Sequence, residues 1–262
     1  MQHRGRERHR LVQSAATRGA VTPGVAPGDW PLGFRPLLRM VAITDTWARL
    51  GHPGGADWPR AFLAVAETCA AGHVVEPNRW HQAMAEVAWA TDEEAEWGAL
   101  IIATPVLLMN ANPYGHRRTV IQAWGEGLGW SPSTLGNLDQ YFHVLGQRNV
   151  SSTPELNSAL GASPTPVPCP QWADLVALVA SLPGQCWPAL TLAQRWGWPS
   201  VTLTLVGLLS SLQAGAGGLP YAGMAHYGNR LAPCWQGYTA DDIDHLADTI
   251  HGQWQGGHLV CG

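Results

Sequence analysis

The chain has 262 residues, which is long enough for one large domain with a substantial core. Only 13% of the residues are charged, against roughly 25% in a typical globular domain, so many solvent-facing positions must carry uncharged side chains. The net charge of -4 gives no general reason to expect a nucleic acid as a partner.

The cysteines and the amino terminus indicate the compartment. Five cysteines, an odd number without a CxxC pair, suit thiols in a reducing compartment better than a disulfide framework. Residues 1–28 are rich in arginine and then in proline and glycine, and they lack the continuous apolar core of a secretory signal. We predict a cytoplasmic protein with a disordered tail over 1–28, although such a tail could also bind an anionic surface or an RNA.

Residues 29–262 predict a succession of helices in one domain. Apolar side chains recur at helical spacing over residues 34–50, 58–71, 78–90, 92–110, 118–128, 134–147, 171–182 and 187–195. Thr91 is a predicted N-cap with Glu94 completing a capping box, and Pro105 should kink or interrupt the helix that follows. No strand-like alternation of useful length occurs. The predicted fold class is all-α, a single compact multi-helix domain.

The uncharged segment from Thr202 to Leu219 has two interpretations. It is nearly long enough to span a bilayer and is rich in small residues. Against a span, Ser210, Ser211, Gln213 and several glycines lower its hydrophobicity, and a proline stands near each end. We therefore predict no membrane span but a buried central helix, apolar on all sides because other helices surround it.

The chain is unusually rich in tryptophan, with 14 residues. We expect each of them to pack between helices, because tryptophan buries a large area at low entropic cost. A second interpretation is a structural or assembly protein whose tryptophan-rich surface contacts a protein partner. That interpretation requires several exposed tryptophans in one patch.

The segment Trp196-Gly197-Trp198-Pro199-Ser200-Val201, with the small-residue run after it, resembles the last conserved segment of the ADP-ribosylglycohydrolase family. The family segment reads Gly-Gly-Asp-Thr-Asp-Thr and continues into a small-residue helix that ends in Ile-Pro. Gly207, Gly215 and Leu219-Pro220 match its spacing. In this register the two aspartates, which are metal ligands in the family, fall on Trp198 and Ser200.

Further anchors extend the resemblance over roughly Glu96 to Tyr221. Ile101-Ile102-Ala103-Thr104-Pro105 keeps a family proline but has Ile102 in place of an arginine. The stretch from Thr119 to Gly129, followed by Leu138 to Val144, is similar to two family helices, without the Thr-His pair between them. This version of the family pattern resembles that of a divergent branch known from cyanobacteria. Nearer the amino terminus, Ile43-Thr44-Asp45-Thr46 offers one carboxylate where the family has Thr-Asp-Asp-Thr.

The resemblance implies a hydrolase in which carboxylates hold a magnesium pair that orients the ribose hydroxyls and the attacking water. Trp198 offers no oxygen ligand and Ser200 only a neutral hydroxyl, so a dinuclear site should be lost. We predict a degenerate, catalytically inactive relative without a metal cofactor and with no assignable catalytic residue. Asp45, Trp198 and Ser200 are the predicted ligand-binding positions, and ADP-ribose or another nucleotide sugar is the predicted ligand. The alternative is an active hydrolase with a rearranged magnesium site that uses Asp45 and acids from elsewhere.

One other set of residues could hold a metal. Asp241, His245 and Asp248 stand at i, i+4 and i+7, as do Asp244, Asp248 and His251, so each set lines one stripe of a helix. Apolar residues occupy the opposite side, which is also the pattern of an amphipathic helix with acids facing water. We favour the solvated face, with Thr239 as the N-cap of this helix.

Overall fold

The structure is a computed structural model that describes residues 34–51, 55–73, 77–109, 131–132, 135–136, 170–214 and 230–257. The elements are α1 (Phe34–Gly51), α2 (Trp58–Ala70), α3 (Pro77–Ala85), α4 (Asp92–Met109), α8 (Trp172–Ser181), α9 (Cys186–Arg195), α10 (Ser200–Ala214), the 3-10 helix η4 (Pro233–Trp235) and α12 (Ala240–Gly257). These described residues contain no strand, and one isolated bridge joins Arg230 to Thr239. The predicted all-α fold class is confirmed.

Part of the sequence analysis concerns residues outside this description. The predicted tail over 1–28 and the predicted helix over 118–128 lie outside it, as does the helix over 134–147 apart from residues 135–136. The same holds for some of the residues that carry the resemblance, namely the stretches 119–129 and 138–144, Gly215, and Leu219-Pro220.

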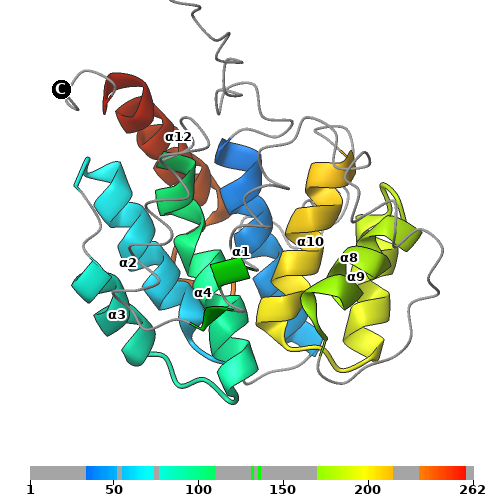
Figure 1. Cartoon of the computed structure of the whole chain (residues 1–262). Coiled ribbons are helices and arrows are strands. Elements are labelled where there is room, and N and C mark those ends of the chain that lie inside the picture. The colour runs from blue at the N-terminus through cyan, green and yellow to red at the C-terminus, as the bar shows by residue number, and fades with distance from the viewer. Residues whose placement is uncertain are drawn as a thin grey trace, which may run out of the picture.

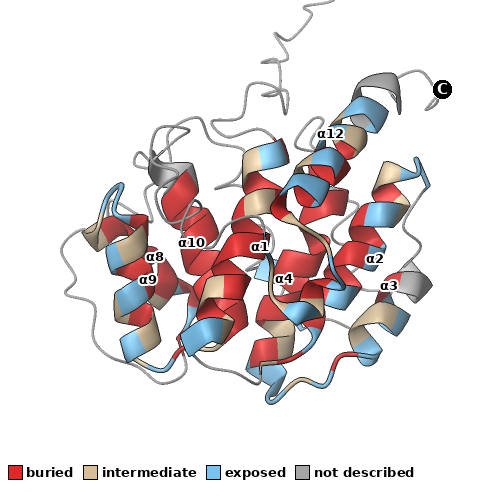
Figure 2. Ribbon diagram, turned by 180° about the vertical axis from the view of Figure 1, so that it is seen from behind, coloured by how far each residue is buried: buried red, intermediate tan, exposed pale blue. Residues whose placement is uncertain are grey.

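Helix α1 lies at the centre of the described helices (Figure 1). It packs against α10 and against α12, while α2 packs against both α4 and α12. Helices α8 and α9 lie beyond α10, and α3 lies beside α2 at the opposite edge. Figure 2 shows that α1 and α10 are buried over most of their length, whereas α9 and α12 each expose one face. A single hydrophobic core joins these helices.

Helix α10 is the buried central helix that the sequence predicted. Its residues from Ser200 to Ser211 are all buried. Two of its hydroxyl groups bond within the helix: Thr204 donates to the Ser200 carbonyl (2.9 Å) and Ser211 to the Gly207 carbonyl (2.8 Å). Among the described helices, none combines the length and the apolar character that crossing a bilayer requires.

The boundaries of α3 and α4 test the local predictions. At α4 the Glu94 amide donates to Thr91 Oγ1 (3.1 Å), while the Glu94 carboxylate accepts from the Ala90 amide (2.9 Å), which confirms Thr91 as the cap. Of the two effects predicted for Pro105, the interruption does not occur: the helix continues to Met109, with buried residues around the proline. Helix α3 ends at Ala85 rather than at residue 90, and the Trp89 indole donates to the Met84 carbonyl (3.2 Å) just beyond its end.

The tryptophans whose burial is described pack against the core, as predicted. None of those whose burial the structure describes is exposed: Trp58, Trp80, Trp97, Trp172, Trp198 and Trp235 are buried, and Trp47, Trp89, Trp187 and Trp196 are half-buried. Several meet other rings, as Trp47 and Trp187 do across α1 and α9 with centroids 5.5 Å apart. This part of the chain therefore presents no exposed tryptophan patch.

Gly207 brings α10 close to α1. A Cβ atom added at Gly207 would lie 2.5 Å from Thr44 Oγ1 and 2.9 Å from Thr44 Cγ2, both closer than real contacts allow. Glycine is therefore required here by the separation of the two helices and not by an unusual backbone conformation. Since Asp45 follows Thr44 directly, this contact also sets how far Asp45 lies from α10.

We expect Gly207→Ala to lower the free energy of unfolding by about 1–3 kcal/mol, the usual cost of overpacking a core. The double variant Gly207→Ala, Thr44→Ala should recover much of that loss, because it removes the two atoms that clash. Gly252→Ala is the matched control: this exposed position in α12 has nothing within 4 Å of an added Cβ, and alanine there should stabilise by about 0.5–1 kcal/mol. Urea denaturation measures all three, and equal effects at the two glycines would contradict the close approach.

Helix α12 begins with the predicted cap. The Asp242 amide donates to Thr239 Oγ1 (3.2 Å), and the Asp242 carboxylate accepts from the Thr239 hydroxyl (2.7 Å) and amide (2.8 Å). These hydrogen bonds lower the pKa of Asp242, and the bond from the Thr239 hydroxyl has the larger effect. Because the pKa is lowered in the folded state, the resulting stabilisation is present above the unfolded value of about 3.9 and is lost as the pH falls through the lowered pKa.

We expect Thr239→Ala to raise the pKa of Asp242 toward its ordinary value, because the variant loses the hydroxyl that bonds the carboxylate. An NMR titration of the Asp242 carboxyl carbon measures this change. The stability difference between wild type and variant should also shrink as the pH falls below about 4. Thr249→Ala, in the same helix, removes a hydroxyl that donates to the His245 carbonyl (2.9 Å) and should leave the pKa of Asp242 unchanged.

Candidate functional site

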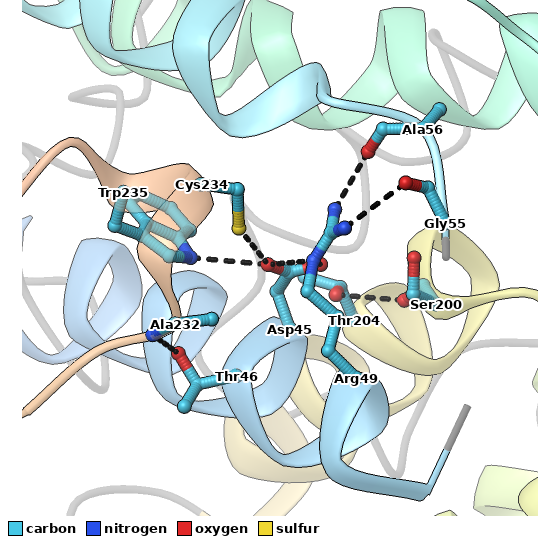
Figure 3. Close-up of polar contacts among 10 residues, drawn as sticks. All are labelled: Asp45, Thr46, Arg49, Gly55, Ala56, Ser200, Thr204, Ala232, Cys234 and Trp235. Carbon is cyan, nitrogen blue, oxygen red and sulfur yellow. Dashed lines mark hydrogen bonds and ion pairs between the residues drawn. The ribbon is translucent and has the colours of Figure 1, made fainter. Parts of the chain in front are cut away.

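Asp45 and Arg49 form a buried ion pair within α1. Asp45 is fully buried (0% exposed), and the Arg49 side chain is 13% exposed. Their spacing of four residues places both on one face of the helix. The Arg49 Nε donates to Asp45 Oδ1 (3.0 Å) and Oδ2 (2.8 Å). The pair lies in the carboxyl-terminal half of α1, beside the start of α10 (Figure 3).

Two other segments supply the remaining partners of this pair. From η4, the Trp235 indole donates to Asp45 Oδ2 (3.0 Å), and the Cys234 thiol lies 3.7 Å from the same oxygen. From the loop before α2, the Gly55 and Ala56 carbonyls accept from Arg49 Nη1 (3.1 Å) and Nη2 (2.6 Å). The pair therefore links α1 to both segments, as Figure 3 shows.

Burial controls the electrostatics of this cluster. Burial raises the pKa of Asp45. The positive charge of Arg49 and the hydrogen bonds from Arg49, Trp235 and Cys234 oppose that rise without cancelling it. Burial acts to lower the pKa of Arg49, but attraction to Asp45 outweighs it and the pKa is raised. For Cys234, burial and then the nearby Asp45 charge raise the pKa to about 12. The thiol is therefore protonated at neutral pH and serves as a hydrogen-bond donor rather than a nucleophile.

The structure brings two of the three predicted site residues into one region. Ser200 opens α10 and is 8% exposed, and its Oγ has no hydrogen-bond partner among the described residues. It faces Gly55, whose carbonyl binds Arg49, so Asp45 and Ser200 both adjoin the Arg49 environment. Trp198, by contrast, is a core side chain, 1% exposed and stacked at a tilt against Trp196 with ring centroids 5.4 Å apart.

This donor set does not fit magnesium. The ion requires several oxygen ligands, usually with anionic charge, and Asp45 is the only carboxylate in the described cluster. Its oxygens already accept from Arg49 and Trp235, and the guanidinium would repel a second cation. Across the described residues, no three or more His, Cys, Asp or Glu side chains are grouped to hold a metal.

The acidic stripe of α12 pairs with α1 instead of forming a metal site. Arg39 bonds Asp244 (2.6 Å) and lies 3.9 Å from Asp241, and Arg35 bonds Asp248. The prediction that these acids simply face water was incomplete, since the sequence did not reveal that two arginines of α1 lie opposite them. The exposed pair of Arg35 and Asp248 contributes little stability, whereas Arg39 and Asp244 are partly buried where α12 meets α1.

A shallow hollow of about 440 Å3 lies at the start of α12, lined by Gln236, Gly237, Tyr238, Asp242, His245, Leu246 and Thr249. Two of its polar groups are already engaged: Tyr238 donates to Glu67, which raises the pKa of the phenol to about 12, and Asp242 caps the helix. Neither of these two groups is therefore available for acid–base chemistry at neutral pH.

Arg49, Cys234 and Trp235 are the residues that the sequence analysis missed. The spacing of Asp45 and Arg49 was a visible signal for an ion pair on one helix face. Cys234 and Trp235 carried no such signal, because Trp235 is 190 residues away from Asp45 in the chain.

Comparisons of the chain with protein-family models, with curated proteins and with solved structures found no match.

We expect Asp45→Ala to cost about 3–5 kcal/mol of unfolding free energy, because it leaves the Arg49 guanidinium largely buried without its counter-ion. The double variant Asp45→Leu, Arg49→Met removes both charges and should cost much less. Urea denaturation compares them. The control is Asp248→Ala, which breaks an exposed pair and should cost no more than about 1 kcal/mol. An Asp45→Ala variant as stable as the control would contradict the structural role of the pair.

Proposed function

We propose that this protein is an ADP-ribosylglycohydrolase-like domain that lacks the hydrolytic activity of that family and acts by binding ADP-ribose or a related nucleotide sugar. The observation that carries the proposal is the pairing of Asp45 with Arg49. Asp45 is the one carboxylate that the resemblance aligns with a family metal ligand in the described chain, and it is committed to an internal cation.

The arrangement of two distant segments supports the resemblance. The family requires the Thr-Asp-Asp-Thr segment and the start of the last small-residue helix to meet, since both supply ligands to the same metals. Here residues 43–46 lie in α1, which packs along α10, and Ser200 opens α10 beside the loop that binds Arg49. Gly207, one of the residues on which the resemblance rests, permits this contact.

The loss of hydrolysis follows from the charges of the cluster. A metal pair would activate water and orient the ribose hydroxyls through its positive charge. Arg49 has a positive charge in the same region, but a guanidinium lacks an open coordination position and cannot lower the pKa of a bound water in that way. Its N–H groups can donate hydrogen bonds to a ligand. The cluster therefore supports binding of a ligand but not metal-assisted hydrolysis.

The two alternative functions have less support. An active hydrolase with a rearranged magnesium site needs several converging carboxylates, and the described residues contain no such group. An assembly protein with a tryptophan-rich surface needs exposed tryptophans, and none is exposed where burial is described. A cytoplasmic location remains part of the proposal, supported by the free thiols of Cys69, Cys186 and Cys234.

Isothermal titration with ADP-ribose, in magnesium and in EDTA, tests the proposal. We expect binding of equal affinity in both buffers and no release of ADP-ribose from an ADP-ribosylated protein substrate. Asp45→Asn is the matched variant, because the amide keeps the shape of the carboxylate and removes its charge. Magnesium-dependent release that disappears in Asp45→Asn would refute the loss of catalysis. Failure of ADP-ribose to bind in either buffer would refute the proposed ligand.

A further inference from the structure

The amino terminus of α10 is buried and lacks hydrogen-bond acceptors among the described residues. The first amides of a helix have no partner within the helix and need one from elsewhere. The Leu203 amide is satisfied by the Pro199 carbonyl (3.0 Å). The amides of Ser200, Val201 and Thr202 have no acceptor among the described residues, although these three residues are 8%, 0% and 0% exposed.

A second, independent observation points to the same place. The Ser200 hydroxyl is buried, has no hydrogen-bond partner among the described residues, and projects from the helix start toward Gly55 (Figure 3). A buried polar group left unpaired costs about 1–3 kcal/mol. Both the helix end and the hydroxyl are thus left with hydrogen-bonding capacity that a ligand would satisfy.

Arg49 borders the same space. A Cβ atom added at Gly55 would lie 2.8 Å from Ser200 Oγ and 3.6 Å from Arg49 Nη1, so both groups converge on one point beside the Gly55 backbone. Arg49 has five N–H donors. Nε uses its one hydrogen for Asp45, while Nη1 and Nη2 each use one of their two hydrogens for the Gly55 and Ala56 carbonyls. Each terminal nitrogen therefore keeps one hydrogen that can bond a ligand.

The groups that meet here are therefore mainly donors, and they favour negative charge. The helix amino terminus contributes a partial positive charge, and Arg49 a full one that Asp45 balances within α1. A second carboxylate whose field reaches Arg49 is that of Asp57, which is exposed and so is screened by water and salt. Helix amino termini with free amides bind phosphate groups in many proteins.

We propose that the amino terminus of α10, with Ser200 and Arg49, binds a tetrahedral oxyanion of the phosphate class. The anion accepts from the free amides, the Ser200 hydroxyl and the outer N–H groups of Arg49. The phosphate can be a free ion or part of a larger ligand such as the diphosphate of ADP-ribose. The inference does not rest on the proposed function, because it concerns the charged group and not the rest of the ligand.

Titration of the full chain with inorganic phosphate at constant ionic strength, followed by calorimetry and by the melting temperature, tests the site, with chloride as the reference anion. We expect phosphate to bind and to raise the melting temperature. Ser200→Ala should weaken phosphate binding about tenfold, the effect of losing one hydrogen bond to a charged group. Ser210→Ala is the matched control: its hydroxyl is also buried and unpaired in α10, but ten residues away, and it should leave phosphate binding unchanged.

A second variant separates binding from folding. Ser200→Asp places a carboxylate at the helix start, where it suits the helix dipole and competes with the anion. We expect it to abolish phosphate binding without lowering stability in phosphate-free buffer. No phosphate-specific response in the wild type, or equal responses in Ser200→Ala and Ser210→Ala, would overturn the proposal.

ADP-ribose then distinguishes the two sources of the phosphate group. Binding of ADP-ribose that Ser200→Ala weakens supports the site as the receptor of a diphosphate. Phosphate binding without any binding of ADP-ribose supports the oxyanion site for the free ion and refutes the proposed function. The two proposals can therefore fail separately.

Discussion

The fold depends on keeping the charge of Asp45 inside a tryptophan-rich core. A carboxylate that leaves water loses several kcal/mol of hydration free energy, and only short, well-directed partners offset the loss. Arg49, Trp235 and Cys234 provide them. Arg49 in turn binds the backbone before α2. Each of these hydrogen bonds also fixes the position of a chain segment. Helix α1, η4 and the loop before α2 must therefore all be in place before the two charges can be buried without a large loss of stability.

Helix α1 meets its two main neighbours by different means. Toward α12 it presents Arg35 and Arg39, which pair with acids at the edge of the contact. Toward α10 it presents Thr44 against Gly207, so that the two backbones approach closely. Both neighbours pack closely on α1 and share its hydrophobic core, but only the contact with α10 requires a glycine. The segment that carries Asp45 therefore meets the middle of α10 through the contact between Thr44 and Gly207.

The charge of the cluster gives the two proposals a common basis. A site built to hold divalent cations surrounds them with carboxylate oxygens. In the described cluster one carboxylate faces one guanidinium, and the neighbouring helix end contributes amide donors. Such a set of groups favours an anionic ligand over a cationic one, and under the proposed function an internal arginine takes the place of an exchangeable metal. Under the proposed function, this exchange converts a hydrolytic site into a binding site.

The sequence alone determined the elements that local rules control. Helical periodicity predicted the helices of the described regions and their number. The Thr91 and Thr239 caps followed from side chains within three residues. The lack of charge predicted that α10 is buried. Pro105 was the local exception, since α4 continues through it without the predicted interruption. Only the tertiary structure decided that Trp235 reaches Asp45, that Arg35 and Arg39 oppose the acids of α12, and that Ser200 faces Gly55. These contacts join residues far apart in the chain, and periodicity within one helix contains no information on which other helix will cover its face.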